Sequence, residues 1–428
     1  MMRIRGHADL APPGTSRVLY IAYASPVPSR LGPARRHYHL LEQLARFYDV
    51  HFLCVGDESE AEAFALHFGD RVRDFTFVRR SAGLYGRHAR KLARTLLGRC
   101  DFLPALEPAL QQACARVTGT HAFDAIVLSS VLLRSLPLPE HVPIVGDTHN
   151  VEFDVLRRTA AHADRVLLRH YARRQWPATR REERRCGEAV DLVLATSARD
   201  RHMFERELGL RRVAVVPNGI DLTEFAPSTR APAPDTILFS GLMSYFPNQQ
   251  AVRWFLRDVF PTVLRGRPGA RLVVAGADPP RWLTALAGPN LEVTGRVPDI
   301  RPFVARASVV VAPLMIGGGT RVKILEALAM ARPMVSTSIG AEGLDLAHGT
   351  SALLADDAAG FADAILTVLG DPRLADQLGS CGRLHVTEHF DWNRIGEEAR
   401  TLLASGIGLR GRGQAVRGPS WPTAVGAS

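Results

Sequence analysis

Residues 307–337 read ASVVVAPLMIGGGTRVKILEALAMARPMVST, and this stretch decides the fold class. An apolar run at 309–312 leads into three glycines at 317–319, and an apolar helical run extends from about 321 to 331. Pro333 ends that run, and residues 334–337 are typical of a second buried strand. A strand, a turn, a helix and a strand in this order predict parallel strands covered by helices.

The glycine-rich turn has the features of an anion site. Glycines let the backbone approach a ligand closely, and the start of the next helix directs free N–H groups and a positive dipole end toward it. Arg321 and Lys323 add two cations at that helix start, where a bound anion such as a diphosphate would compensate them. Glu326 is the only acid in an otherwise apolar helix, so it needs a polar partner.

Other nucleotide-binding patterns do not fit this turn. No Gly-Lys-Ser/Thr triplet follows, which excludes a Walker A loop, and the Gly-x-Gly-x-x-Gly spacing of dinucleotide folds is absent. A glycine-rich turn without any ligand is also common in doubly wound folds, so the glycines alone do not prove a site.

The rest of the chain repeats the strand–helix alternation in two halves, which predicts an α/β fold of two Rossmann-like, doubly wound parallel sheets facing a cleft. The predicted strands are 17–24, 50–55, 124–128, 143–146 and 192–196 in the first half, and 237–240, 271–275, 291–293, 309–312 and 334–337 in the second. The predicted domains are a disordered N-terminus (1–16), a first domain (17–225), a linker (226–235), a second domain (236–388), a returning helix (389–405) and a disordered tail (406–428).

Composition is typical of a cytoplasmic globular protein. The 428 residues are 46% hydrophobic, and no run of about 18 apolar residues could span a membrane. The start lacks the apolar core of a signal peptide, and five scattered cysteines favour reduced thiols. The net charge of +10 comes almost wholly from arginine, because Lys91 and Lys323 are the only lysines.

The motifs together resemble the retaining GT-B glycosyltransferases of the family-4 type (glycosyl transferases group 1), in a Gly-Gly-Gly-Thr-Arg variant. The resemblance rests on 317–329 with 332–337, on Val215–Asp221, on Ile237–Gly241 and on Val293–Asp299. It implies transfer of a hexosyl unit from a nucleotide-diphosphate sugar, with UDP or GDP as the carrier, and no metal or other cofactor. Two departures stand out: Gly318 occupies a position where the family commonly has an acid, and Leu242 replaces a common Arg.

The resemblance also implies roles for single residues. His149, in the turn after the strand at 143–146, would lie against the donor sugar, and Arg321 and Lys323 would stabilise charge on the leaving diphosphate. The donor-binding positions would be Gly241, Val297, Gly318, Gly319, Thr320 and Glu326. Gly32 would lie near the phosphates or the acceptor.

The implied mechanism retains the anomeric configuration by front-face transfer. No pair of carboxylates of the kind that retaining glycosidases use is identifiable. No Asp-x-Asp motif occurs, which argues against metal-bridged donor binding.

The acceptor and the location stay open at this level. The acceptor could be lipid-linked, a saccharide or a small molecule, as in polysaccharide or glycolipid biosynthesis. Two arginine-rich segments, Tyr85–Leu96 and Arg157–Arg185, could rest on the anionic inner face of the cytoplasmic membrane, or could be ordinary surface helices. No nucleic-acid-binding module is recognisable, so we expect no nucleic-acid partner. The alternatives are an inactive nucleotide-sugar-binding protein and a nucleotide-sugar epimerase of GT-B architecture.

Overall fold

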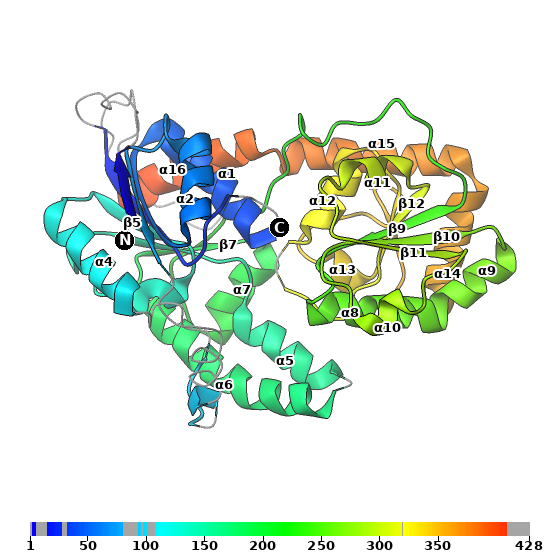
Figure 1. The fold of residues 1–428 in the computed structure, drawn as a ribbon, viewed down its shortest axis with the longest axis horizontal. Coiled ribbons are helices and arrows are strands. Elements are labelled where there is room, and N and C mark those ends of the chain that lie inside the picture. The colour runs from blue at the N-terminus through cyan, green and yellow to red at the C-terminus, as the bar shows by residue number, and fades with distance from the viewer. Residues whose placement is uncertain are drawn as a thin grey trace, which may run out of the picture. The chain divides into compact units, whose positions relative to one another are not determined.

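The computed structural model describes residues 2–5, 15–27, 32–79, 93–95, 97–101, 108–163, 165–318 and 320–408. Contacts divide the chain into two compact units. The first unit comprises residues 1–217 and 393–428, and the second comprises residues 218–392. Figure 1 labels the elements of both units.

The first unit is built on a sheet that has eight strands within the described residues, in the order β1-β4-β3-β2-β5-β6-β7-β8. All neighbours pair in parallel except β1 and β4, which are antiparallel. The strands are β1 (Met2–Arg5), β2 (Arg17–Ala22), β3 (Asp49–Val55), β4 (Asp74–Val78), β5 (Ala125–Leu128), β6 (Ile144–Asp147), β7 (Leu192–Ala195) and β8 (Val213–Val215).

Helices complete the first unit. They are α1 (Gly32–Phe47), α2 (Glu58–Phe68), α4 (Pro108–Thr120), the 3₁₀ turn η2 (Val131–Ser135), α5 (Glu152–His162), α6 (Val166–Glu188), α7 (Ala198–Glu207) and α16 (Trp392–Ile407). One sheet face packs on α2, where the rings of Phe52 and Phe64 stack with centroids 4.5 Å apart. Leu19, Leu53 and Ile126 belong to the buried cluster that includes α4 on the other face. Burial on both faces explains why these strands are continuously apolar.

The second unit contains a parallel sheet of six described strands in the order β11-β10-β9-β12-β13-β14. They are β9 (Thr236–Ser240), β10 (Arg271–Ala275), β11 (Leu291–Gly295), β12 (Val309–Ala312), β13 (Met334–Ser336) and β14 (Leu353–Leu354). The helices are α8 (Phe246–Trp254), the π-helical turn η3 (Phe255–Val259), α9 (Phe260–Gly266), α10 (Arg281–Thr284), α11 (Arg301–Arg306), α12 (Val322–Ala329), α13 (Ser338–Ala341), α14 (Ala358–Gly370) and α15 (Pro372–His389).

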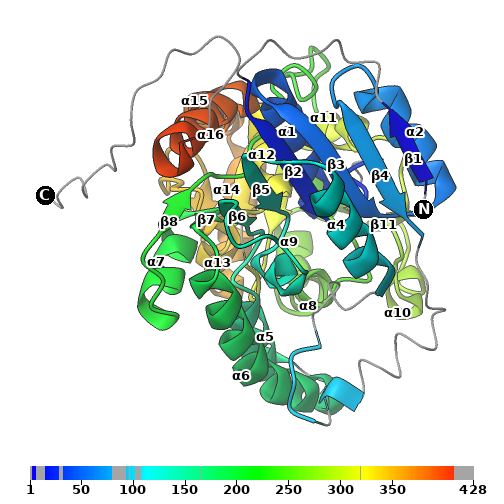
Figure 2. The ribbon, with the colours of Figure 1, turned by 90° about the vertical axis from the view of Figure 1, so that its left-hand side faces the viewer.

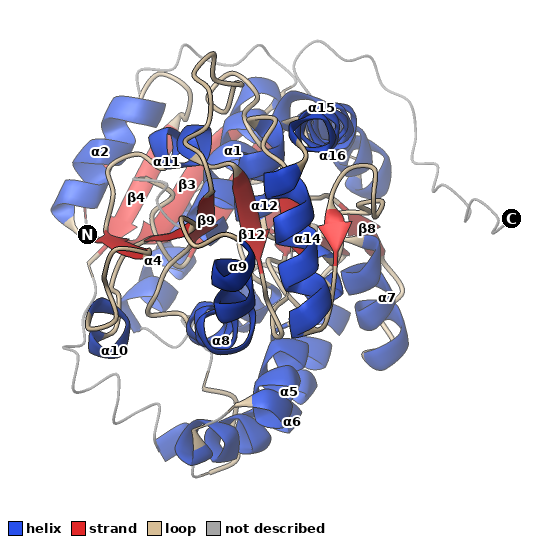
Figure 3. Cartoon of the chain, turned by 90° about the vertical axis from the view of Figure 1, so that its right-hand side faces the viewer, coloured by secondary structure: helices blue, strands red, loops and turns tan. Residues whose placement is uncertain are grey.

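Strand residues of the second unit alternate between two cores. Val309 and Val311 pack with α8, α9 and α14, whereas Val310 and Ala312 pack with α11 and α12. This period of two is the consequence of strand geometry. Figure 3 shows helices (blue) flanking these strands (red) on both sides.

The observed elements confirm the α/β prediction of two doubly wound parallel sheets. The predicted strand positions match β2, β3, β5, β6, β7 and β9 to β13, with ends that differ by a few residues. The sequence reading missed β1, β4, β8 and β14. β1 lies inside the stretch predicted to be disordered. β4 (DFTFV) begins with an acid and contains a threonine, so it lacks a continuous apolar run.

One domain boundary and one helical segment differ from the sequence reading. The first unit ends at Pro217 and not at residue 225, since Ile220 hydrogen-bonds to Phe390 and Phe225 is buried in the core of the second unit. The segment Arg157–Arg185 is not one helix, because Ala163 and Arg165 separate α5 from α6. The final helix α16 joins the first unit from Asn393 onward, as predicted for the returning helix. Tyr85–Leu92 and Leu96 of the other basic segment and the tail from residue 409 lie outside the described residues.

No helix among the described residues is long and apolar enough to cross a membrane. All five cysteines are free thiols, and four of them are buried.

Candidate active site

In the second unit, the predicted donor residues gather where the strand order reverses. β9 and β12 are neighbours, and the chain leaves β9 toward β10 on one side and β12 toward β13 on the other. Gly241 follows β9, and Gly317 to Thr320 follow β12. Ligands of open α/β sheets bind beyond the carboxyl ends of strands at such a reversal.

Lys323 lies beside Gly241 at this point. Its Nζ donates to Asn248 Oδ1 over 2.9 Å and lies 4.2 Å from the centroid of the Phe239 ring. A Cβ at Gly241 would come within 2.8 Å of Nζ, and the φ of +153° also favours glycine there. Gly241 and Lys323, both predicted to bind the donor, are therefore in contact, and the missing Cβ of Gly241 leaves room for the ammonium group.

Asn248 is a site residue that the sequence reading missed. Its Nδ2 donates to the Leu242 carbonyl over 2.9 Å, which turns Oδ1 toward Lys323. Burial is the main cause that lowers the pKa of Lys323 to about 7; the Glu326 carboxylate opposes the shift, and the Arg321 guanidinium adds to it. No sequence signal marked Asn248, because its importance depends on a contact across 75 positions.

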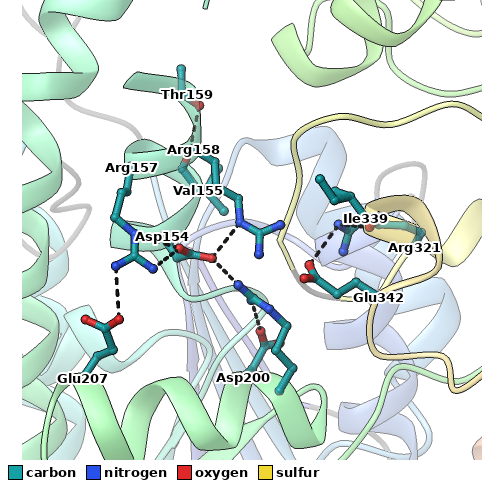
Figure 4. A network of polar contacts seen from close by, with 11 residues as sticks. Asp154, Val155, Arg157, Arg158, Thr159, Asp200, Glu207, Arg321, Ile339 and Glu342 are labelled. Atoms are coloured by element: carbon teal, nitrogen blue, oxygen red, sulfur yellow. Dashed lines mark hydrogen bonds and ion pairs between the residues drawn. The ribbon is translucent and has the colours of Figure 1, made fainter. Parts of the chain in front are cut away.

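The other predicted residues of this unit are placed as follows. Arg321 is the N-cap residue of α12, is buried, donates to the Ile339 carbonyl over 2.8 Å and lies 3.8 Å from Glu342 (Figure 4). Its charge is therefore already partly compensated within the protein. Thr320 and Glu326 are also buried, and Val297 follows β11 and is half-buried. Gly318 is partly exposed, and Gly319 lies outside the described residues.

In the first unit, His149 follows β6 and is part of a hydrogen-bonded chain. His149 Nε2 is 2.9 Å from His37 Nε2, and His37 Nδ1 is 3.0 Å from the Tyr20 hydroxyl. Burial lowers the pKa of His37 to about 3 and that of His149 well below its usual value, so both rings are neutral. The hydrogen bonds from Tyr20 through His37 to His149 can run in either direction, because each ring and the hydroxyl can donate or accept. His149 is thus oriented for binding through a partner that the sequence reading missed.

A buried ion pair holds this turn. Arg36 donates to Asp147 through Nε over 3.0 Å and through Nη2 over 2.6 Å, and its Nη1 reaches the Pro217 carbonyl over 3.1 Å. Both side chains are almost fully buried. Asp147 also belongs to one of two His/Asp groups whose atoms lie close enough to consider a metal, with His37 and His149. The Arg36 guanidinium already pairs with the Asp147 carboxylate, so these three residues do not suit a metal cation.

A small recess adjoins His149. It is lined by Tyr23, Ser130, Val131, Thr148, His149, Asn150, Glu152 and Glu183. Its volume of about 10 Å³ matches about one water molecule. Since Tyr23, Ser130 and Thr148 follow β2, β5 and β6, the recess lies at the carboxyl edge, where the strand order of the first sheet reverses.

Glu183 fixes the backbone beside the recess. Its two oxygens accept the N–H groups of Glu152 and Phe153, each over 2.9 Å, and so cap α5, whose N-cap residue Val151 makes no side-chain cap. Burial raises the pKa of Glu183 to about 8, helped by the Glu152 carboxyl and opposed by the two amides. Burial likewise raises the pKa of Glu152 to about 7. The two carboxyls therefore retain protons near neutral pH.

These raised pKa values predict a pH-dependent stability. The folded chain keeps the Glu183 proton while the unfolded chain releases it above about pH 4.5, so folding stability falls as pH rises toward 8. We expect the melting temperature to decline between about pH 5 and about pH 8 in the wild type, and to decline less in Glu183→Gln. Glu188→Gln, an exposed change on the same helix, serves as the control and should follow the wild type. Equal slopes in all three proteins would contradict the assignment.

The lowered pKa of Lys323 predicts pH-dependent ligand binding. A diphosphate favours the protonated ammonium, so affinity should fall as pH rises above about 7, by at most tenfold per pH unit. Calorimetric titration between about pH 7 and about pH 9, with whichever of UDP, GDP and ADP binds at pH 7, measures this, and Lys323→Ala should remove the dependence. A flat wild-type profile would show that Lys323 does not contact the phosphates.

Comparison with known proteins agrees with this architecture. Residues 234–371 match a family model described as glycosyl transferases group 1, and residues 32–224 match one described as glycosyltransferase family 4. A glycogen synthase of Mycobacterium tuberculosis is 29% identical over 215 residues, which is 47% of this chain and 51% of that protein. A GDP-mannose-dependent phosphatidylinositol monomannoside mannosyltransferase of Corynebacterium glutamicum is 25% identical over 54% of this chain and 66% of that protein. The chain thus spans about half to two thirds of the length of these relatives.

Solved structures show the same fold. HepE of Anabaena in complex with UDP-glucose superimposes with a TM-score of 0.66 at 15% identity, covering 91% of this chain and 100% of HepE. WaaG, a glycosyltransferase involved in lipopolysaccharide biosynthesis, gives a TM-score of 0.60 at 16% identity over 90% of this chain and 99% of WaaG. The fold is therefore GT-B, and the sequence matches support a GT-B glycosyltransferase.

Proposed function

We propose that this protein transfers a glycosyl unit from a nucleotide-diphosphate sugar to a hydroxyl acceptor, with retention at the anomeric carbon. The observation that carries the proposal is the Lys323 ammonium beside Gly241 at the strand reversal of the second sheet. A partly buried cation with a single neutral side-chain acceptor, Asn248, suits an anion that arrives as a ligand. UDP-glucose in HepE and the GDP-mannose dependence of the Corynebacterium mannosyltransferase support a donor of this class.

The residue roles follow from this placement. Lys323 would bind the leaving diphosphate directly, whereas Arg321 would contribute from a more compensated position against α13. Glu326 would accept hydrogen bonds from ribose hydroxyls. His149 would orient the sugar through its neutral ring, and no carboxylate nucleophile is needed in a front-face transfer. Gly32, the first residue of α1, and Val297 keep their predicted roles in phosphate or acceptor contact and in facing the base.

Binding of nucleotides tests the donor site. Titration of UDP, GDP, ADP and CMP by calorimetry should give tight binding of one diphosphate, weakened in Lys323→Ala and in Glu326→Ala.

Once an acceptor is found, Lys323→Ala or Arg321→Ala should lower kcat by about 100-fold or more, the scale of losing one preorganised donor. Leu286→Ala, an exposed change in the same unit, is the control. Turnover of both variants within about threefold of wild type would refute their assignment.

Metal removal tests the mechanism. Donor binding and turnover should persist in EDTA, because the proposed phosphate contacts come from Lys323, Arg321 and backbone amides. A strict requirement for Mg²⁺ or Mn²⁺ would contradict this. The anomeric configuration of the product, measured by NMR, tests retention.

Two rival functions give different outcomes in the same assays. An inactive nucleotide-sugar-binding protein would bind the diphosphate without turnover on any acceptor. An epimerase would convert the sugar nucleotide with no acceptor present. Gly318 and Leu242 favour the first rival, because both remove groups that the resembling family commonly uses.

A further inference from the structure

The helical hairpin formed by α5 and α6 presents an apolar tip. Val166 is 75% exposed and Leu167 is 87% exposed at the start of α6. They are consecutive, and no other two exposed large hydrophobic residues adjoin in the described part of the chain. Figure 2 shows α5 and α6 running together away from the strands of the first unit. Adjacent exposed apolar side chains at the end of a hairpin are a candidate contact point for an apolar partner.

Arginines surround this tip along the same face of α6. Arg173 and Arg174 follow Val166 and Leu167 by seven residues, so they lie on the same side of the helix. Both are exposed, and neither has a hydrogen bond or ion pair with any described residue. From Arg165 to Arg181 the chain has six arginines and no acid. The opposite side of α6, with Ala172, Gln175, Thr179 and Glu183, is buried.

A second basic segment, distant in sequence, adjoins the same helix. Gln175 donates to the Thr95 hydroxyl over 3.1 Å and to the Arg99 carbonyl over 3.2 Å, and Tyr171 donates to Asp101 over 2.7 Å. Leu97 in this segment is 69% exposed and precedes Gly98, whose carbonyl accepts from Arg181. The structure therefore packs Thr95 and the residues 97–101 that follow the first arginine-rich segment against α6.

The hairpin is held firmly at its base and its turn. Asp154 of α5 accepts from Arg157 over 2.7 Å, as Figure 4 shows, and from Arg199 of α7 over 2.6 Å. Burial alone would raise the pKa of Asp154, but these guanidinium groups keep it below its usual value. Arg169 closes the turn by donating to the Ala163 carbonyl over 2.9 and 2.7 Å. The exposed face is thus presented in one orientation and does not need to fold on binding.

We propose that the α5–α6 hairpin docks the protein on an anionic lipid surface, with Val166 and Leu167 inserted at the interface and Arg173 and Arg174 on the head groups. Arginines without a partner among the described residues, on the same helix face as exposed apolar side chains, match a bilayer, whose surface is negative and whose interior is apolar. A nucleic acid would use the arginines but would leave the two aliphatic side chains in water. The proposal does not depend on the proposed transferase activity.

Vesicle co-sedimentation of the whole chain tests the proposal. The protein should bind vesicles of phosphatidylcholine with phosphatidylglycerol at low salt, bind phosphatidylcholine alone weakly, and be released by salt. Arg173→Glu/Arg174→Glu should raise the lipid concentration for half-binding at least tenfold, which equals about 1.4 kcal/mol. Arg116→Glu/Arg211→Glu, with the same charge change at exposed sites elsewhere on the first unit, should have a much smaller effect.

The apolar part of the surface has its own matched pair. Leu167→Asp should weaken vesicle binding at least tenfold, whereas Leu66→Asp on α2, equally exposed at 87%, should change it less than twofold. Circular dichroism confirms that the variants are folded.

Wild-type protein that stays in the supernatant at low salt, or equal binding by Leu167→Asp and Leu66→Asp, would overturn the proposal. Salt-sensitive RNA binding that Arg173→Glu/Arg174→Glu abolishes, without vesicle binding, would indicate a nucleic-acid surface instead. Titration of the same variants with the nucleotide diphosphate that binds the wild type should be unchanged, which separates this test from that of the donor site.

Discussion

Parallel strand pairing is the constraint on which the rest of this structure depends. All carboxyl ends of a parallel sheet meet at one edge, and helices cover both faces, so that edge is where loops can carry polar groups. In each unit the strand order reverses near the middle of the sheet, between β2 and β5 in the first and between β9 and β12 in the second. His149 and Lys323, the two residues with most of the proposed chemistry, both lie at the edge that this pairing creates.

Buried charges at these edges are held in different ways. Arg36 and Asp147 form a closed pair with several hydrogen bonds, which orients the turn of His149 but leaves no charge for a ligand. Among the described residues, Lys323 donates a hydrogen bond to the neutral Asn248 and lies against the face of Phe239, and burial lowers its pKa. An incompletely compensated cation is costly in the empty protein and gains most from an anionic ligand. Arg36 therefore has a structural role in the turn of His149, whereas Lys323 can bind an anionic ligand.

The arginines of the α5–α6 hairpin likewise differ in whether the protein supplies partners for their charges. Arg157, Arg169 and Arg199 are used within the protein, on Asp154 or on the turn carbonyl, and they stabilise the hairpin. Arg173 and Arg174 have no such partner among the described residues and lie on the exposed face. A high arginine content alone would not distinguish these groups. Their partners in the folded chain do so.

The sequence by itself determined the strand–helix alternation, the two-sheet fold and the glycine-rich turn before α12, because these depend on local periodicity and on backbone freedom at glycine. The position of Lys323 in the helix after that turn also indicated a binding role, and the family resemblance implied one for His149. The sequence could not indicate Asn248, His37 or Arg36, because their roles come from contacts between elements that are far apart in the chain. It placed the boundary of the first unit too late, since Ile220 and Phe225 are assigned by tertiary packing and not by composition. The pKa values of Lys323, Glu152 and Glu183 were likewise decided only by tertiary structure, because burial that removes water from a charge is a property of the fold.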